Sequence, residues 1–128
     1  MPIEIHWANN NQSILIEKFN DVWTWQQVAD ACQMQIRPTL SNIPHPVILI
    51  QDMVGSHWTP TTNLLQEVQH MMKTPYPNNV IMVIVVSGDR SIDALVTAAY
   101  NRFGGSECDY QSSPTVNQAI RTASTYLG

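Results

Sequence analysis

The chain carries at residues 80–86 the stretch VIMVIVV, which is apolar at every position. A strand without a polar face is typical of the interior of a parallel sheet that helices cover on both faces. A second run rich in β-branched residues, Val47–Met53, follows two prolines and is also suited to an interior strand. The two runs predict an α/β fold with a largely parallel sheet.

Segments with apolar residues at helical spacing surround these strands. Each begins with a Ser or Thr that can cap a helix, and Thr24 with Gln27 makes a capping-box pattern. Pro38 lacks an amide donor and should kink or end the first helix, although Leu40 would continue its apolar stripe. The chain should leave the third helix through a left-handed turn at Gly104 and Gly105. The predicted helices are Thr24–Arg37, Thr59–Thr74 with Pro60 in the first turn, Ser91–Phe103, and Ser113–Leu127 with Pro114 in the first turn.

Three further β-like runs complete the predicted fold. Ile3–Trp7 and Ser13–Phe19 flank an Asn-rich turn and predict a hairpin. The alternation around Cys108 and Tyr110 predicts a half-exposed edge strand. The resulting order is ββαβαβαβα, a mostly parallel or mixed sheet packed with four helices in a single domain over residues 1–128.

Composition narrows the classes of partner. The 128 residues are 44% hydrophobic and carry a formal net charge of −4, with six Lys and Arg residues that stand singly. These residues form no basic stripe, so nucleic acid is a poor candidate partner. Met1–Trp7 lacks the pattern of a signal peptide, and the longest apolar run is too short to span a bilayer. We therefore expect a cytoplasmic protein that does not insert into membranes.

No metal or other cofactor is expected. The two cysteines, Cys32 and Cys108, are far apart in the sequence and are predicted to be reduced and mostly buried thiols. The four His residues form no HxH or HExxH arrangement with a nearby carboxylate or thiolate.

The order of elements resembles that of STAS-like domains, the group that contains bacterial anti-sigma-factor antagonists and the cytoplasmic tails of sulfate transporters. The resemblance covers nearly the whole chain. Two local features match as well: Trp23, Thr24 and Trp25 open the first helix, and the proline-led strand Pro46–Asp52 ends in an acidic residue. The resemblance implies a switchable binding surface.

Antagonists of this family carry a phosphorylatable Ser, within an Asp-Ser-Ser-Gly-like motif, at the start of the second helix. Here that place, residues 56–62, reads SHWTPTT, without the acidic residue and the glycine. A helix N-terminus would stabilise a phosphate, but a threonine at this place is also an ordinary cap. The predicted partner-binding residues are Asp52, Ser56, His57, Trp58, Thr59, Thr61 and Thr62.

Two further stretches contain residue types that allow a chemical interpretation. Ser56, His57 and Asp52 are the residue types of a hydrolytic triad, but adjacent side chains cannot readily aim at each other and the GxSxG motif is missing. The loop 87–91 joins a buried strand to a helix N-terminus, where small anions often bind. Its single glycine and the charge of Asp89 favour an ordinary turn capped by Asp89 or Ser91. The candidate ligand residues of this loop are Ser87, Gly88, Arg90 and Ser91.

Three functions follow from the sequence. The first is a non-enzymatic regulatory or protein-interaction domain that docks Asp52–Thr62 against a protein partner or a second copy of itself. The second is a carrier of a small apolar ligand, whose pocket the Trp and Met residues would line. The third, a hydrolase or phosphate-handling enzyme, ranks last because the sequence suggests no concave site with perturbed titratable groups. The tryptophans, Trp7, Trp23, Trp25 and Trp58, fit a binding surface or the ends of the core equally well.

Overall fold

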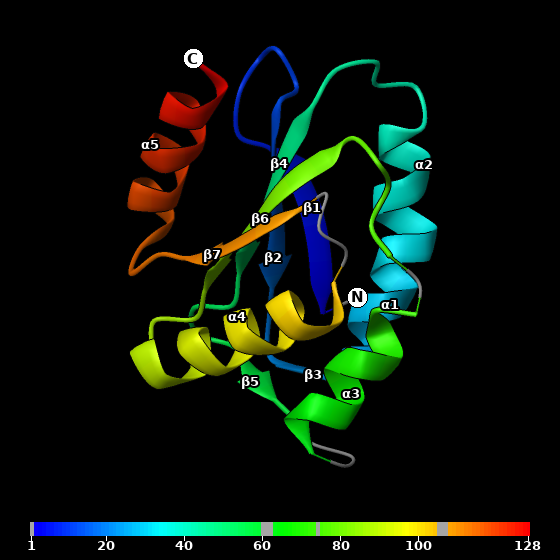
Figure 1. Ribbon diagram of the computed structural model, residues 1–128, viewed down its shortest axis with the longest axis vertical. Helices are drawn as coiled ribbons and strands as arrows, with labels where there is room; N and C mark the ends of the chain where they lie inside the picture. The colour runs from blue at the N-terminus through cyan, green and yellow to red at the C-terminus, as the bar shows by residue number, and fades with distance from the viewer. Residues whose placement is uncertain (1, 60–62, 74, 105–107) are drawn as a thin grey trace.

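The computed structural model of the protein describes residues 2–59, 63–73, 75–104 and 108–128. Within these residues five strands form one sheet in the order β1-β2-β4-β6-β7 (Figure 1). The hairpin strands β1 and β2 pair antiparallel, and β2, β4, β6 and β7 pair in parallel. The mixed α/β sheet is therefore confirmed, with β7 at its edge. The bounds are β1 Ile3–Trp7, β2 Ile14–Phe19, β4 Val47–Asp52, β6 Val80–Val86 and β7 Asp109–Ser112.

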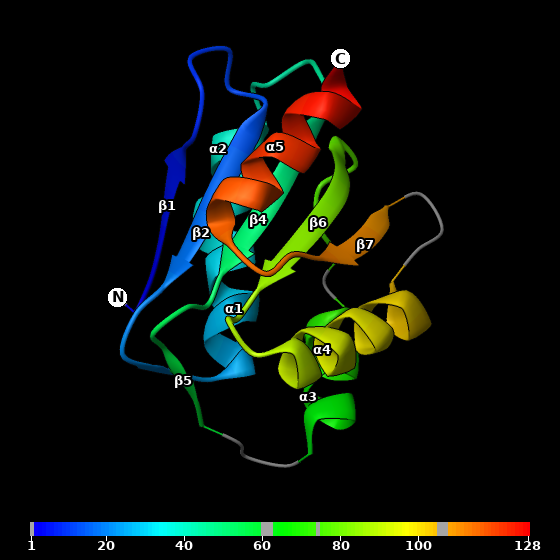
Figure 2. The same cartoon turned by 90° about the vertical axis from the view of Figure 1, so that its left-hand side faces the viewer.

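Helices cover both faces of this sheet (Figures 1 and 2). On one face α5, Val116–Leu127, packs its two buried alanines against isoleucines of the central strands. The other face carries α3, Leu64–Met71, α4, Arg90–Phe103, and a continuous helical stretch near the N-terminus. Because both faces are covered, β6 is buried at every position except Ile81, which is partly buried. None of the helices in the described part of the chain is long and apolar enough to cross a bilayer.

The N-terminal helical stretch continues further than predicted. It consists of α1, Trp25–Ala31, a π-helical turn η1, Cys32–Ile36, and α2, Arg37–Leu40, so Pro38 does not end it. In an α-helix the ring of Pro38 would clash with the carbonyl four residues earlier. The wider π turn lies directly before Pro38, where such a clash would arise. The predicted capping box is confirmed, since Thr24 and Gln27 bond each other's backbone N–H groups.

A second, two-stranded sheet was not predicted. Its strands, β3, Val22–Trp23, and β5, His57–Trp58, pair in parallel just beyond the carboxyl ends of β2 and β4. The predicted start of the second helix is wrong for this reason: Thr59 donates its backbone N–H to the Trp23 carbonyl, as an extension of the small sheet. The helix starts at Leu64, after its N-cap Asn63. Pro60, Thr61 and Thr62 lie outside the described residues.

The predicted cap of the last helix is wrong by two residues, and of the two caps predicted for the helix before it, Asp89 or Ser91, Asp89 is confirmed. Asp89, not Ser91, caps α4, and its carboxylate accepts the backbone N–H groups of Ser91 and Ile92. Thr115, not Ser113, caps α5, and Pro114 lies before this helix rather than in its first turn. In both helices the true cap has an extended backbone and a side-chain oxygen within reach of the first free amides.

Gly104 follows α4 with φ −79°, so the predicted left-handed exit is wrong at this residue, and Gly105 lies outside the described residues. Glycine is needed because a Cβ at position 104 would lie 2.5 Å from the Tyr110 hydroxyl and 2.6 Å from the Tyr100 carbonyl oxygen. We expect Gly104→Ala to lower the free energy of unfolding by about 1 to 3 kcal/mol, as overpacking does. Urea denaturation measures this change. A loss below about 0.5 kcal/mol would mean that Tyr110 moves aside at little cost.

Candidate functional site

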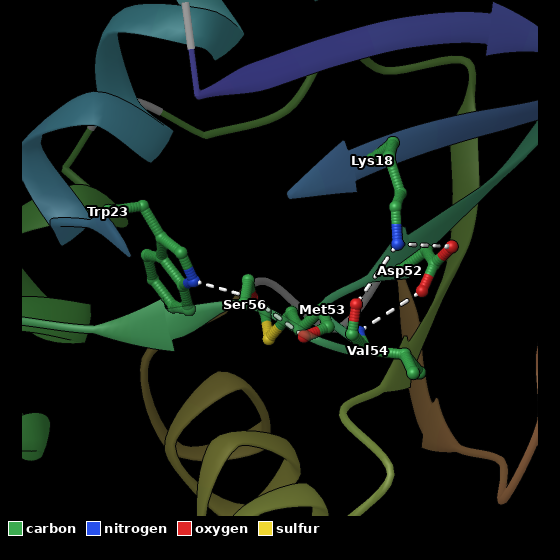
Figure 3. Close-up of polar contacts among 6 residues, drawn as sticks. All are labelled: Lys18, Trp23, Asp52, Met53, Val54 and Ser56. Carbon is green, nitrogen blue, oxygen red and sulfur yellow. Dashed lines mark hydrogen bonds and ion pairs between the residues drawn. The ribbon is translucent and has the colours of Figure 1, made fainter. Parts of the chain in front are cut away.

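The loop that joins β4 to β5 is held by charged and backbone contacts (Figure 3). Lys18 forms an ion pair with Asp52 at 3.3 Å and donates a hydrogen bond to the Val54 carbonyl at 3.0 Å. The Asp52 carboxylate in turn accepts the Val54 backbone N–H at 3.2 Å. Gly55 supplies the φ of +78° at which the chain reverses. Asp52, a predicted partner-binding residue, therefore shapes this loop.

Ser56 joins the same loop to β3. Its hydroxyl donates to the Met53 carbonyl at 2.6 Å and accepts the indole N–H of Trp23 at 2.9 Å (Figure 3). The hydroxyl proton is thus directed to a backbone carbonyl and not to His57, which is exposed on β5. The arrangement holds Trp23 in place, and the adjacent residues do not form the hydrogen bond that a triad needs.

The Ser56–Trp23 contact leads to a stability prediction. Ser56→Ala should lower the free energy of unfolding by about 1 to 3 kcal/mol, because the buried indole N–H of Trp23 loses its acceptor. In the double variant Trp23→Phe, Ser56→Ala, the cost should be smaller than the sum of the two single costs. Chemical denaturation of the four proteins gives this coupling. Additive costs would show that the hydrogen bond contributes nothing.

A pocket of about 160 Å³ opens beside this loop. It brings together Ser56 and Trp58 from the predicted docking segment and Ser87 from the predicted ligand loop. Met53 of the docking segment and the two tryptophans that open the first helix also line it, as the carrier hypothesis expected of Trp and Met residues. The three apolar residues of α4 were not placed here by the sequence. The pocket is lined by Trp23, Trp25, Met53, Ser56, Trp58, Ser87, Ile92, Leu95 and Val96.

Two of these α4 residues, Ile92 and Leu95, have the helical spacing of the core-facing side but lie outside the core. The side chain of Ile92 is 45% exposed and that of Leu95 is 58% exposed, whereas Val96 is buried. The apolar stripe of α4 is wider than the part of it that the core buries. The exposed edge of this stripe, Ile92 and Leu95, forms the mouth of the pocket. Val54 is 43% exposed and lies close to Gly88, the neighbour in the chain of the pocket residue Ser87. We call Val54, Trp58, Ile92 and Leu95, together with the pocket between them, the pocket face.

Most polar groups of the loop 87–91 already form hydrogen bonds. Asp89 accepts the N–H groups of Ser91 and Ile92, and the buried carboxylate of Asp93 accepts the N–H of Ser87 at 2.8 Å. The Ser87 hydroxyl donates to the Asp89 carbonyl. An anion at this helix N-terminus would therefore compete with two carboxylates for the same amides.

The remaining residues of that loop lie apart from the pocket. Arg90 lines a separate groove with Asp93, Ala94 and the segment Ser112–Pro114. Gly88 takes φ +84°, as the tight turn requires, and Ser91 is exposed. The structure thus brings Ser87 to the docking segment and leaves Gly88, Arg90 and Ser91 outside the pocket.

The tryptophans form a chain of edge-to-face contacts that runs inward from the pocket. Ring centroids lie 4.7 Å apart for Phe19 and Trp23, 5.1 Å for Trp23 and Trp25, and 6.1 Å for Trp25 and Tyr100. Such pairs contribute beyond the area that they bury. Trp23 and Trp25 are therefore core residues and pocket walls at once, while Trp58 is half-buried.

Tyr100 is also part of a buried hydrogen-bond network in the same core. Its hydroxyl donates to Gln51 Oε1 at 2.7 Å, and Gln51 Nε2 donates to Glu17 at 2.9 Å and to the Tyr76 hydroxyl at 2.8 Å. Burial raises the pKa of Glu17 to about 7, although the hydrogen bond from Gln51 lowers it. Glu17 and Gln51 are register neighbours on β2 and β4. The signal that could have revealed them is a polar residue at a core-facing position of each interior strand.

Metal ligands are not gathered anywhere in the described residues: no group of three His, Cys, Asp or Glu side chains there could hold an ion. The burial predicted for the cysteines is confirmed for Cys32, which is fully buried, and Cys108 is half-buried. Burial raises the pKa of each thiol to about 11, so both are protonated at neutral pH.

The fold is similar to that of one solved structure. It is an uncharacterised protein of the DUF3478 family with a SpoIIAA-like fold, from Shewanella loihica PV-4, at 11% sequence identity and a TM-score of 0.63. The match covers 94% of this chain and 91% of that one. No protein-family model and no curated protein matches the sequence. The chain therefore has a SpoIIAA-like, that is STAS-like, fold, as the order of its elements predicted.

Proposed function

We propose that this domain is a non-enzymatic regulatory module of the cytoplasm that binds another protein through the pocket face. The observation that carries the proposal is the exposure of branched apolar side chains, Ile92 and Leu95, at the mouth of an aromatic pocket. Exposed apolar residues around a well-packed pocket are typical of protein-binding surfaces, where one or two anchors supply most of the affinity.

The rigidity of the neighbouring loop supports the same proposal. Lys18, Asp52 and Ser56 fix the segment that carries Trp58, so little conformational freedom is lost when a partner docks. Trp58 is also tied to β3 through the small parallel sheet. We therefore extend the docking surface predicted from the sequence, Asp52–Thr62, to the first two turns of α4; its residues 60–62 lie outside the described part of the chain.

Pocket size favours this function over a carrier of lipid-like ligands. The pocket of about 160 Å³ is smaller than the roughly 300 to 1,000 Å³ that encloses a drug-sized ligand. The larger groove beside Arg90 and Asp93 has charged walls and is unsuited to an apolar cargo. The catalytic alternative is disfavoured because the Ser56 hydroxyl donates to a backbone carbonyl.

Affinity capture with three forms of the domain tests the proposal. The baits are wild type, Leu95→Asp in the pocket face, and Tyr126→Asp as a matched control. Tyr126 is 56% exposed on α5, which packs against the opposite face of the sheet. Circular dichroism checks that each bait is folded, and the captured protein is then purified and its affinity for each form measured.

We expect wild type and Tyr126→Asp to bind the purified partner equally, and Leu95→Asp to bind it at least about tenfold more weakly, as loss of a central anchor does. If the captured protein is a second copy of the chain, sedimentation should show a dimer that only Leu95→Asp disrupts. Equal binding by Leu95→Asp, or an equal loss with Tyr126→Asp, contradicts the proposal.

A further inference from the structure

Strand β1 forms one edge of the main sheet. Its neighbour on one side is β2, and on its other side no strand in the described part of the chain pairs with it (Figure 2). Ala8 donates its backbone N–H to the Ile14 carbonyl, and Asn20 donates its own to the Pro2 carbonyl. Bonded and non-bonded pairs alternate in an antiparallel ladder, so the even-numbered residues of β1 bond β2. The backbone groups that point away from β2 are those of Ile3, Ile5 and Trp7.

Most of these outward groups are available to a further strand. The Ile3 carbonyl already accepts a hydrogen bond from the side chain of Gln35 at 3.1 Å. For Ile5 and Trp7, the described residues supply no hydrogen bond on this side. A row of open amides and carbonyls at the edge of a sheet is a template on which another extended chain can pair.

The side chains of β1 form two rows. Glu4 and His6 are exposed, and His6 lies opposite Ile16, whose side chain belongs to the core cluster under α5. Ile5 and Trp7 point to the other face of the sheet, where they are only partly buried against the larger core cluster. The edge therefore presents an acidic and a basic side chain on one face, and two half-covered apolar side chains on the other.

A second copy of β1 fits this edge in one antiparallel register. When Ile5 lies opposite Ile5 of the second copy, the two residues exchange both of their outward backbone hydrogen bonds. Glu4 then lies opposite His6 of the second copy, and the two-fold axis repeats this contact between unlike side chains. On the other face, Trp7 lies opposite Ile3 of the second copy. The apolar row thus continues from one copy into the other.

Other registers lack this complementarity. A shift by one residue would bring the outward groups of one strand against residues whose backbone groups already bond β2. A shift by two residues places either Glu4 opposite Glu4 of the second copy, or His6 opposite His6. Like charges directly opposite each other are destabilising, so the side chains of the edge favour the register centred on Ile5.

We propose that two copies of the chain pair antiparallel through β1 and join their sheets into one. This inference goes beyond the proposed binding of another protein, because no residue of β1 lines the pocket between the β4–β5 loop and α4. The dimer therefore presents two pocket faces. A partner with two matching sites would be held more tightly by the dimer than by a single copy.

Sedimentation equilibrium of the purified domain tests the pairing with two variants of one exposed residue. His6→Glu places like charges opposite each other at both contacts with Glu4, whereas His6→Lys keeps them unlike. Gln111→Glu is the control for net charge, because it makes the same change on β7, at the other edge of the sheet. Leu95→Asp is the control for the pocket face. Circular dichroism checks that every variant is folded.

We expect wild type to dimerise with a dissociation constant on the order of 10 to 100 μM, as small interfaces do. His6→Lys should dimerise at least as tightly as wild type, and His6→Glu at least about tenfold more weakly. Gln111→Glu and Leu95→Asp should behave as wild type. A monomeric wild type, equal dimers of His6→Glu and His6→Lys, or a dimer that only Leu95→Asp disrupts would overturn the proposal.

Disulfide crosslinking reads the register directly. Glu4→Cys and His6→Cys are made in a Cys108→Ser background, which removes the half-buried native thiol. Opposite residues of a non-bonded pair have Cα atoms about 4.5 Å apart, within the range of a disulfide. Oxidation should crosslink the mixture of the two variants far more than either variant alone. Crosslinking that is as strong in one variant alone as in the mixture would contradict the register centred on Ile5.

Discussion

Replacing Gln51 with leucine is expected to lower the free energy of unfolding by about 3 to 5 kcal/mol at pH 8. Gln51 is fully buried and is the hydrogen-bond partner of Glu17, Tyr76 and Tyr100 at once. Leucine fills a similar volume but leaves three buried polar groups without that partner. At pH 8 the carboxyl of Glu17 is mostly ionised, since its pKa is raised only to about 7, so an unpaired charge remains in the core.

A double variant separates lost hydrogen bonds from poor packing. Glu17→Leu, Gln51→Leu removes the buried carboxyl together with its donor, and should recover part of the stability that Gln51→Leu alone loses. Urea denaturation at constant pH measures both proteins. If the double variant is less stable than Gln51→Leu, packing rather than the unpaired carboxylate limits this part of the core.

The contribution of Glu17 to the stability of the wild-type protein should fall as the pH rises from about 4.5 to 7. Desolvation raises the pKa of Glu17 from 4.5 to about 7 in the folded state, so the folded protein binds more protons than the unfolded chain within this window. The resulting loss is about 3 kcal/mol at pH 8 relative to pH 4. Cys32, Tyr76 and Tyr100 face the same carboxyl, but burial raises the pKa of each above its ordinary value and outside this window.

Glu17→Gln isolates this contribution, because the amide keeps an oxygen acceptor for Gln51 and cannot ionise. The stability difference between the variant and wild type should grow in favour of the variant by about 3 kcal/mol between pH 4 and pH 8. Denaturation curves at several pH values give the difference directly. A difference that does not change with pH would mean that Glu17 ionises in the folded protein as readily as in the unfolded chain.

The elements that could be predicted from the sequence are those whose residue patterns are compatible with only one kind of local structure. An uninterrupted apolar strand such as Val80–Val86 has to lie between covered faces, and the Thr24–Gln27 capping box marks a helix start without an alternative. The start of α3 could not be predicted, because Thr59 is also a good cap and only the pairing of β5 with β3 excludes it. That pairing depends on residues more than thirty positions apart.

The candidate site could be predicted only in part, for a related reason. Ser56 and Trp58 were singled out in one segment and Ser87 in another, and their meeting at one pocket is a consequence of strand order. Ile92 and Leu95 carry the same helical spacing as core residues, and spacing does not say how far the core extends. The network of Glu17 and Gln51 was missed because two polar residues within apolar strands gain their partners only when β2 and β4 pair.

Hydrogen–deuterium exchange of the domain, alone and with its purified protein partner, tests most directly whether the pocket face is the binding surface. The two states should differ mainly in peptides that contain Met53–Trp58 and Arg90–Val96, where exchange slows on binding. Peptides from α5, on the other face of the sheet, should exchange equally in both states. Protection centred on α5, with Arg90–Val96 unchanged, would contradict binding at the pocket face.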